Sequence, residues 1–483
     1  MTTLQVDVAI VGAGTAGLTA RREALKHGAR RVVLIEGGPY GTTCARVGCM
    51  PSKLLISAAD LAFEASHAAN FGIDLPEPPR IDGRAVMARV QRERDRFVGF
   101  VVDSVESLPA EQRLRGWARF AGPSALVVTG EDGAETRVEA GTVVVAVGSR
   151  PRIPPILAAL DSLGDRVLTN EHVFELDDLP TSLAVLGTGV IGLELGQAMH
   201  RLGVRTAIFG RSHRVGPIAC PTLQRTVREV LGAELDLRLG TSLTGARTGE
   251  GGVELSWTDA EGRAHSEFFE RVLVAAGRVS NIDRLGIEAA ELAVDERGVP
   301  SFDGRTMQCG DRPVFIAGDV TGERTILHEA ADEGRVAGAN AAMYPEVRAH
   351  CRRTPLSIVF TDPQMAVVGE PGSTKMCKNG MGEVSYDDQG RARVMGKNRG
   401  VVRVYAGEPR AELIGAEMFG PRVEHTAHLL AWAVQSDMTV EQALQMPFYH
   451  PVVEEGIRTA LRNLAANLKL DAKPLPLDCG PGD

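Results

Sequence analysis

The chain alternates short apolar runs of strand length with longer stretches of helix-like periodicity. Its beginning shows the pattern most clearly: an apolar run at Val6–Val11, a helix-like segment that ends at His27, and a second apolar run at Val32–Glu36. Two strand-length runs around one helix-length segment predict a β-α-β unit with parallel strands. We therefore expect an α/β fold.

The same pattern returns in the middle of the chain. An apolar run begins at Leu183, a helix-like segment follows, and Thr206–Gly210 closes the unit. Glycines punctuate both units at matching places, with Gly187 standing 175 positions after Gly12. This internal duplication predicts two doubly wound, Rossmann-like domains, each able to bind a dinucleotide.

The segments between and around the two units supply further elements. A long helix-forming run covers Leu54 to Ala69, and residues 68–119 are mostly polar and helical, with a loop at Pro76–Pro79. Further strands are expected at Ala125–Thr129, at Arg137–Val147 and within Val272–Arg278.

After Arg352 the character of the sequence changes, and a third, α+β domain is expected. Its predicted strands lie at Ser357–Phe360, Val401–Tyr405 and Leu413–Phe419, and its first helix at Val423–Val434. Thr439-Val-Glu-Gln442 has the spacing of a capping box, which predicts the start of another helix.

Size and charge narrow the class of protein. With 483 residues the chain is long enough for two to four domains, and its net charge of −9 argues against nucleic acid and anionic membranes as partners. No apolar run approaches the roughly 18 residues of a membrane span, and Met1 to Val11 leads straight into a strand. An odd number of cysteines, seven, does not suit a secreted disulfide framework. We expect a soluble cytoplasmic enzyme.

Two of the cysteines stand five apart, in Gly41-Thr-Thr-Cys44-Ala-Arg-Val-Gly-Cys49-Met-Pro-Ser-Lys53. Five residues of helix rise roughly 7.5 Å, whereas a disulfide needs Cα atoms within about 7 Å. A bridge between Cys44 and Cys49 would therefore need a distortion, which Gly48 permits. Cys49 would then lie near a helix N-terminus, where the helix dipole favours a thiolate. By spacing alone, two unrelated buried thiols are an equal alternative.

The residues around this pair remove the ambiguity. The string resembles the redox-active disulfide of the pyridine nucleotide-disulfide oxidoreductases, among them dihydrolipoyl dehydrogenase, glutathione reductase and mercuric reductase, and it departs at Arg46, where asparagine is usual. The resemblance implies that Cys44 exchanges with substrate and that Cys49 forms the thiolate over the flavin. It also places Thr43 and Lys53 beside the flavin.

The first β-α-β unit has Gly12-x-Gly14-x-x-Gly17 at its first turn and Glu36 19 residues after the last glycine. These glycines let backbone approach a pyrophosphate at a helix N-terminus, and the acid can accept hydrogen bonds from a ribose. The alternative is a tight glycine turn of another α/β protein. The corresponding unit of the family binds FAD, and the resemblance implies the same for this chain.

Other segments match the family's FAD contacts, some of them only in part. Gly116-Trp-Ala118-Arg-Phe120 stands where the family has a glycine at the Ala118 position, and Gly148-Ser-Arg-Pro151 ends the first part of the FAD domain. Gly277 and Arg278 mark the return to that domain, and Asp319 matches the ribitol ligand. The last of these segments consists of Thr325, Ile326, Leu327 and His328.

The second unit, Gly187-x-Gly189-x-x-Gly192, is implied to bind NAD or NADP. Glu194 matches the glutamate that the family pairs with the lysine of Pro-Ser-Lys, although an exposed helix glutamate is the alternative.

The dinucleotide preference rests on the end of the second unit, where Gly210-Arg211-Ser-His-Arg214 contains no acid. Arg211 and Arg214 suit a 2′-phosphate, which favours NADP. Gly192 as the third glycine is the NAD-type choice, so both cofactors stay open.

Near the C-terminus, His450-Pro451-Val-Val-Glu-Glu455 matches the family's catalytic base and the carboxylate that orients it. Pro451 is expected to start a helix with Glu455 in its first turn. In the family this pair reaches the disulfide of the other subunit, which implies a homodimer with shared active sites.

The other cysteines show no pattern of metal ligands. No metal-ligand spacing joins Cys220, Cys309, Cys351 and Cys377, and we expect no metal site. Cys479 is interpreted as a surface thiol.

The expected organisation is an FAD-binding domain at 1–151 that resumes at 278–350, an NAD(P)-binding domain at 152–277, a dimerisation domain at 351–469, and a flexible tail at 470–483. The leading functional hypothesis is dihydrolipoyl dehydrogenase, with a lipoyl dithiol as substrate. The alternatives are an NADPH-dependent reductase of another small disulfide and a non-catalytic flavin-binding scaffold. Mercuric reductase is disfavoured, because the chain has His450 and lacks a C-terminal cysteine pair.

Overall fold

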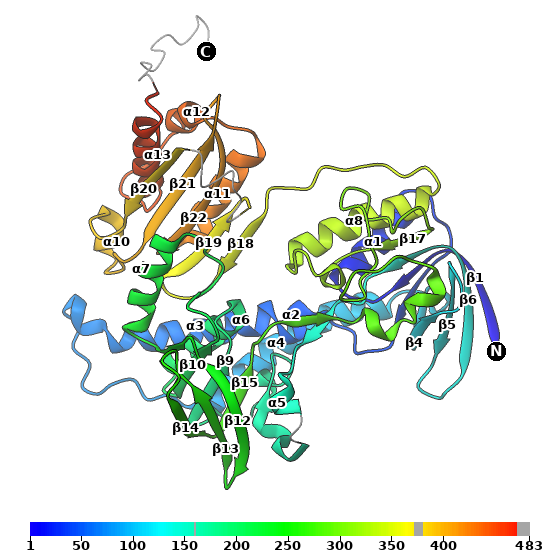
Figure 1. The fold of residues 1–483 in the computed structure, drawn as a ribbon, viewed down its shortest axis with the longest axis horizontal. Helices are drawn as coiled ribbons and strands as arrows, with labels where there is room; N and C mark the ends of the chain where they lie inside the picture. Colours follow the sequence, from blue (N-terminus) through cyan, green and yellow to red (C-terminus); the bar gives the residue numbers. More distant parts are fainter. Residues whose placement is uncertain (159–160, 371–379, 471–483) are drawn as a thin grey trace, which may run out of the picture.

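The structure is a computed structural model that describes residues 1–158, 161–370 and 380–470. Cys377, Cys479 and residues 471–483 of the predicted tail lie outside these ranges. Three large sheets organise the chain, and Figure 1 shows them in three different parts of the molecule, each with helices beside it. The expected α/β fold with two Rossmann-like domains and an α+β C-terminal domain is confirmed.

The first sheet contains seven strands in the order β3-β2-β1-β6-β5-β4, and β17 pairs with β6. The strands around β1 run parallel, whereas β4, β5 and β6 pair antiparallel. The strands are β1 (Thr2–Val11), β2 (Val32–Glu36), β3 (Arg113–Arg115), β4 (Trp117–Phe120), β5 (Ala125–Thr129), β6 (Glu135–Val145) and β17 (Val314–Ile316).

Two helices, α1 (Thr15–Lys26) and α8 (Leu327–Met343), lie side by side near this sheet (Figure 1). They approach closely because small residues face each other: a side chain at Gly334 or Gly338 would overlap the backbone of α1 at Ala16 or Ala20. The buried residues Val8, Ile10 and Leu34 of the strands pack against these helices in one apolar core.

The second sheet is entirely parallel, in the order β11-β10-β9-β15-β8. Its strands are β8 (Val167–Leu168), β9 (Ser182–Leu186), β10 (Arg205–Gly210), β11 (Asp236–Leu239) and β15 (Arg271–Val274), and its helices are α5 (Pro155–Ala158), α6 (Val190–Arg201) and α7 (Pro221–Gly232). An antiparallel sheet of β12 (Ser242–Gly249), β13 (Gly252–Thr258) and β14 (Ala264–Phe269) is inserted before β15. This insertion was not predicted from the sequence, because β12 and β14 are largely exposed and lack a long apolar run.

Two short strands connect the first two sheets. β7 (Ser149–Pro151) and β16 (Arg278–Ser280) pair antiparallel, so the chain leaves and re-enters the first domain side by side. Between the sheets lie the helices α2 (Thr43–Val47), α3 (Cys49–Ser66) and α4 (Gly83–Glu106). The predicted helix at Leu54–Ala69 begins earlier, at Cys49. Within the segment 68–119 that was predicted to be mostly helical, residues 113–115 and 117–119 belong to strands.

The third sheet is antiparallel, in the order β18-β19-β22-β21-β20. Its strands are β18 (Leu356–Val359), β19 (Gln364–Val368), β20 (Gly380–Ser385), β21 (Val401–Gly407) and β22 (Glu412–Gly420), and its helices are α10 (Gly390–Val394), α11 (Val423–Gln435), α12 (Val440–Gln445) and α13 (Glu455–Asn467). The predicted capping box at Thr439 and Gln442 is confirmed at the start of α12.

Short 3-10 turns complete the described residues: η1 (Ala68–Phe71), η2 (Ala110–Gln112), η3 (Asp161–Arg166), η4 (Val173–Glu175), η5 (Ile282–Arg284), η6 (Ile287–Ala290) and η7 (Asp319–Thr321). Within residues 1–158, 161–370 and 380–470, no helix has the length and apolar character that crossing a membrane requires.

Candidate active site

The two cysteines of the sequence motif flank a break between two helices. Cys44 lies in α2 and Cys49 is the first residue of α3, and Gly48 separates the helices. A side chain at Gly48 would place its Cβ 3.0 Å from the Thr43 carbonyl oxygen, so glycine allows the close approach. The predicted break at Gly48 and the position of Cys49 at a helix N-terminus are both confirmed.

The two thiols are free in this structure and hydrogen-bond to each other. The hydrogen bond from Cys44, together with the positive charge of Lys53, lowers the pKa of Cys49 to about 7 despite burial. The same hydrogen bond, followed by burial and the nearby Cys49 charge, raises the pKa of Cys44. The two pKa values are therefore shifted in opposite directions, which is the direction expected if Cys49 is the thiolate of the pair. The disulfide form stays a prediction.

Lys53 lies one turn into α3, and its ammonium group pairs with a carboxylate of α6. The distance from Lys53 Nζ to Glu194 Oε2 is 2.7 Å, and Glu194 is 4% exposed. The other carboxylate oxygen accepts the backbone N–H of Phe360 at 2.9 Å, and Lys53 Nζ lies 4.4 Å from the centre of the Phe360 ring. Glu194 is therefore not an exposed helix glutamate, and the alternative interpretation of this residue is wrong.

The first glycine of each predicted dinucleotide motif has a backbone that favours glycine. Gly12 has φ +111° and Gly187 has φ +130°, and a side chain at either would overlap a carbonyl oxygen of a neighbouring strand end, at Ala146 or Ala275. The two loops therefore repeat the same construction in the two domains. The structure supports the duplication that the sequence predicted.

The other two glycines of each loop have different surroundings, one tightly packed and one open. Gly17 and Gly192 leave no room for a Cβ beside the preceding loop carbonyl, whereas Gly14 and Gly189 have no atom within 4 Å of a Cβ position. Gly14 and Gly189 are also the N-cap residues of α1 and α6. Open space at the N-terminus of a 12-residue helix fits a pyrophosphate, and it occurs twice. The residues present therefore fit two dinucleotides.

Glu36 lies at the end of β2, as predicted, and its carboxylate braces the first glycine loop. It accepts the Ala13 N–H at 2.8 Å and the Gly38 N–H at 2.7 Å, one on each oxygen. Each carboxylate oxygen retains a second acceptor position. Contact with a ribose stays a prediction, and the bracing of the loop is a role that the sequence analysis missed.

The predicted ribitol ligand, Asp319, belongs to a small polar network. Ser149 donates its hydroxyl to Asp319 Oδ2 at 3.1 Å, and Arg278 donates from Nε to Ser149 Oγ at 2.8 Å. Burial lowers the pKa of Arg278. The paired strands β7 and β16 bring these residues together, with Gly148 and Gly277 next to their ends. Ser149 was missed, although it follows Gly148 in the motif.

The other residues predicted to contact FAD lie in strand β4 and at the starts of helices α2 and α8. Ala118 is buried in β4 opposite Val128, so its strand position is fixed by pairing. Thr43 is the first residue of α2. Thr325, Ile326, Leu327 and His328 are exposed where the 17-residue helix α8 begins.

Arg211 and Arg214 follow β10 and are exposed. Arg214 donates to the Pro217 carbonyl oxygen at 2.5 Å, and its own carbonyl accepts the Thr188 hydroxyl at 2.8 Å. Thr188 belongs to the second glycine loop, so the backbone of Arg214 is tied to the predicted nicotinamide dinucleotide site. The Arg214 side chain is already engaged, which leaves Arg211 as the more accessible cation.

His450 lies in a turn before α13, and the Glu455 carboxylate fixes its ring. Nδ1 lies 3.0 Å and 3.1 Å from the two carboxylate oxygens, and Glu455 also accepts the Val452 N–H at 3.2 Å. The predicted helix start at Pro451 is wrong, since α13 begins at Glu455, whereas the expected position of Glu455 in the first turn of that helix is confirmed. The His450 side chain is 80% exposed on this chain.

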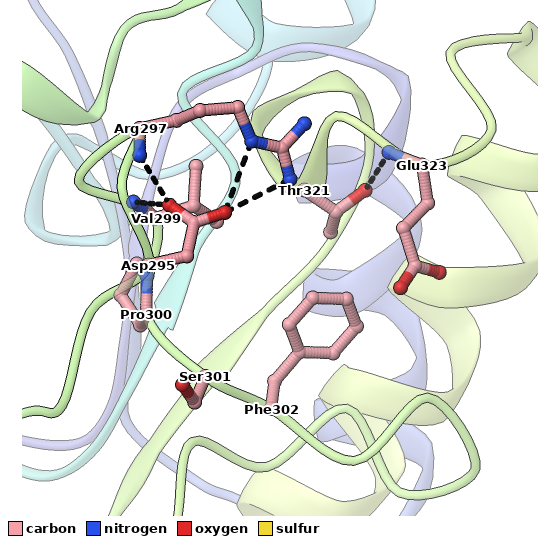
Figure 2. A pocket seen from close by; sticks show the side chains of 8 residues that line it. All are labelled: Asp295, Arg297, Val299, Pro300, Ser301, Phe302, Thr321 and Glu323. Atoms are coloured by element: carbon pink, nitrogen blue, oxygen red, sulfur yellow. Dashed lines mark hydrogen bonds and ion pairs between the residues drawn. The ribbon is translucent and has the colours of Figure 1, made fainter.

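A separate cavity of about 260 Å³ lies behind the Asp319 turn and is shown in Figure 2. Asp295 accepts the backbone N–H groups of Arg297 and Val299 and pairs with the Arg297 guanidinium, while the Thr321 hydroxyl accepts the Glu323 N–H. Asp295 and Arg297 thus pair with each other, and the Thr321 hydroxyl is hydrogen-bonded to Glu323 of the following loop, so we assign no ligand to this cavity. In the part of the chain that the structure describes, no cluster of three or more metal-ligating side chains occurs.

A dithiol pair between two dinucleotide loops defines the class: a nucleotide-dependent disulfide oxidoreductase. Comparison with known families agrees, since residues 6–334 match the pyridine nucleotide-disulphide oxidoreductases and residues 356–461 match their dimerisation domain. The chain belongs to this family. Membership implies FAD and a nicotinamide dinucleotide as cofactors, and the dimerisation domain indicates a homodimer.

Relatives within the family differ in their substrates. The chain is 31% identical to dihydrolipoyl dehydrogenase 3 of Pseudomonas aeruginosa, over 94% of this chain and 97% of that protein. It is 30% identical to a mercuric reductase of Acidithiobacillus ferrooxidans, over 96% of this chain and 84% of that protein. Among solved structures, LpdA of Mycobacterium tuberculosis matches with a TM-score of 0.81 and 26% identity, over 96% of this chain and all of that one.

Proposed function

We propose that this flavoprotein disulfide oxidoreductase is a dihydrolipoyl dehydrogenase. The proposal rests on one observation above all: the Cys44–Cys49 pair stands at the Lys53–Glu194 contact between the two dinucleotide-binding units. The relative at 31% identity, named a dihydrolipoyl dehydrogenase, supports the same substrate class. The presence of the cysteine pair and of the His450–Glu455 pair argues against a non-catalytic scaffold.

In the proposed reaction, a substrate dithiol attacks Cys44 of the Cys44–Cys49 disulfide. The mixed disulfide between substrate and Cys44 closes when the second substrate thiolate displaces Cys44, and the products are the substrate disulfide and the protein dithiol. FAD, which the Gly12, Gly14 and Gly17 loop would hold, would supply the chemistry that carries the two electrons of this dithiol to NAD(P)+ as hydride, with release of a proton. Lys53 holds negative charge at Cys49 and favours its departure as thiolate.

The proton transfers of the proposed reaction require a base near Cys44. Hydrogen bonding and burial raise the pKa of Cys44, so this thiol does not ionise unaided near neutral pH. Within the described residues of one chain, His450 hydrogen-bonds to Glu455 and to neither cysteine. We propose that His450 of one subunit serves Cys44 of the other, with Glu455 orienting the ring so that Nε2 takes the proton.

Oxidation of dihydrolipoamide tests the function directly. Purified enzyme with dihydrolipoamide and NAD+ or NADP+ is expected to form the reduced nicotinamide, followed by its absorbance. Under anaerobic conditions dihydrolipoamide alone is expected to bleach the flavin, because the protein dithiol donates its electrons to it. If dihydrolipoamide fails to bleach the flavin while NADPH does so, the substrate is another disulfide and the enzyme works as a reductase.

That second candidate, an NADPH-dependent reductase of a small disulfide, is favoured by the end of β10. Gly210 and Arg211 stand where an acid would repel a 2′-phosphate, and Arg211 is exposed next to the loop that Thr188 and Arg214 tie together. A guanidinium suits a phosphate by bidentate, charge-assisted hydrogen bonds. NADP is therefore proposed as at least a competent cofactor.

Replacing Arg211 with alanine is expected to weaken NADP(H) use selectively. A charge-assisted contact contributes about 1.5–3 kcal/mol, which corresponds to a roughly ten- to hundredfold rise in KM for NADP(H). The KM for NAD(H) should hardly change, because NAD has no 2′-phosphate. Arg214→Ala is the matched control, since its side chain is engaged by Pro217. Equal effects of Arg211→Ala on both cofactors, or a wild-type enzyme confined to NAD, would contradict the role of Arg211.

A further inference from the structure

Helix α6 buries three polar side chains on one face. Glu194, Gln197 and Arg201 follow one another at helical spacing, and the Arg201 side chain is 1% exposed. Glu194 is the partner of Lys53, and Arg201 lies two turns further along the same face. The predicted functional glutamate and this buried arginine thus belong to one continuous contact surface.

Helix α3 follows this surface in register. Lys53 pairs with Glu194 at 2.7 Å, and Asp60, seven residues later, pairs with Arg201 at 2.8 Å, seven residues after Glu194. The same offset of 141 positions joins both pairs, so the helices run parallel with two ion pairs spaced two turns apart. The Phe63 ring lies 3.8 Å from the Arg201 guanidinium carbon and covers it. Figure 1 shows α3 and α6 side by side below the β18–β22 sheet.

The loop between β18 and β19 closes the third side of the junction. Gln197 exchanges two hydrogen bonds with the Asp362 backbone, at 2.8 Å and 3.0 Å, and Arg201 contacts the Asp362 carboxylate at 3.3 Å. Phe360 of the same loop contacts both Lys53 and Glu194. One face of α6 therefore connects the cysteine helix, the nicotinamide-binding unit and the C-terminal domain.

Arg201 is the residue that holds the far end of this junction. Its guanidinium also forms a fork with Glu234, at 2.6 Å from Nε and 3.1 Å from the second terminal nitrogen. Three carboxylates, those of Asp60, Glu234 and Asp362, therefore converge on one buried cation. Only the planar, five-donor guanidinium can satisfy such an arrangement.

We propose that Arg201, through Asp60, is a positioning residue for the active site: it fixes the register of α3 on α6, so that Lys53 stays beside both Glu194 and Cys49. This inference rests on the proposed roles of Lys53 and Cys49. The charged groups that face Cys49 are Lys53 and Glu194, in addition to the Cys44 thiol. Those that face Asp60 are Arg201, Asp362 and Lys397.

The test is the ionisation of Cys49 in the FAD-loaded protein. In a Cys44→Ser background, alkylation of Cys49 by iodoacetamide is followed against pH by peptide mass spectrometry. Asp60→Asn is expected to slow alkylation at pH 6 by about three- to tenfold and to shift the profile upward by roughly half to one pH unit. The limiting rate at high pH should be unchanged, because only the thiolate fraction depends on Lys53.

The direction in which the Cys49 alkylation rate changes distinguishes a positioning role of Asp60 from a direct electrostatic effect of its charge. Asp60 lies 11 residues after Cys49, which is about 16 Å along a helix and beyond a Debye length of about 10 Å at 0.1 M salt. Any residual direct effect of removing its negative charge would favour the Cys49 thiolate and speed alkylation. Slower alkylation therefore requires movement of Lys53.

Two further variants make the result decisive. Glu234→Gln is the matched control: it removes another carboxylate from Arg201 but no contact to α3, so it should lower thermal stability without moving the Cys49 profile. Asp60→Glu should restore the wild-type profile. The proposal is overturned if Asp60→Asn leaves the profile in place or speeds alkylation, or if Glu234→Gln shifts it equally. Because the readout is thiol ionisation, failure of dihydrolipoamide turnover would not be mistaken for failure of this inference.

Discussion

Replacing Cys44 with serine is expected to abolish turnover of any dithiol or disulfide substrate while NAD(P)H still bleaches the flavin. A serine hydroxyl keeps the size of the thiol but cannot form a sulfur–sulfur bond. Loss of the attacked sulfur should lower the turnover number by at least about 10³-fold, the scale on which removal of a nucleophile acts. Steady-state assays with dihydrolipoamide, combined with anaerobic flavin spectra, separate the two half-reactions.

The remaining cysteines provide controls for this prediction. Cys351 is exposed and Cys309 is buried, and neither lies in the dithiol pair. Burial raises the pKa of Cys309 to about 12, so this thiol is unreactive near neutral pH. Cys351→Ser should retain wild-type turnover. Wild-type rates in Cys44→Ser, or a comparable loss in Cys351→Ser, would exclude the Cys44–Cys49 disulfide as the redox centre.

The parts of the site that follow from local sequence were predictable. Glycines with positive φ, a helix N-cap next to an open space, and a cysteine at a helix start are fixed by a few neighbouring residues, so Gly12, Gly187 and Cys49 lie where the sequence indicated. Resemblance to the family supplied the long-range pairing of Lys53 with Glu194, which spacing alone could not give, because the two residues are 141 positions apart.

The parts that depend on tertiary packing were missed. Arg201 reads as an ordinary basic residue near the end of a helix, and nothing in its neighbours shows that Asp60, Glu234 and Asp362 converge on it. The start of α13 was misplaced for a related reason. A proline at position 451 favours a helix start, but here the backbone forms a turn and the helix begins only at Glu455.

The predicted role of His450 implies an active site that is shared between the two subunits of a dimer. His450→Ala is expected to lower turnover of a dithiol by about 10²–10⁴, the usual contribution of a general base, with FAD still bound. His265→Ala is the matched control, because His265 is a second histidine paired with a carboxylate, at 2.8 Å from Asp259, in the β12–β14 sheet. That variant should retain wild-type turnover.

Hybrid dimers decide whether His450 acts within its own chain or across the interface. A His450→Ala subunit co-expressed with a Cys49→Ser subunit, each with its own affinity tag, yields a purified hybrid in which neither chain is complete. If the site is shared, the intact His450 of one chain meets the intact cysteine pair of the other at one of the two sites, and about half of wild-type turnover per dimer returns. If each chain supplied its own base, both sites would lack a catalytic group and the hybrid would be as inactive as its parents. Recovered activity would also explain why a well-oriented imidazole is left 80% exposed on a single chain.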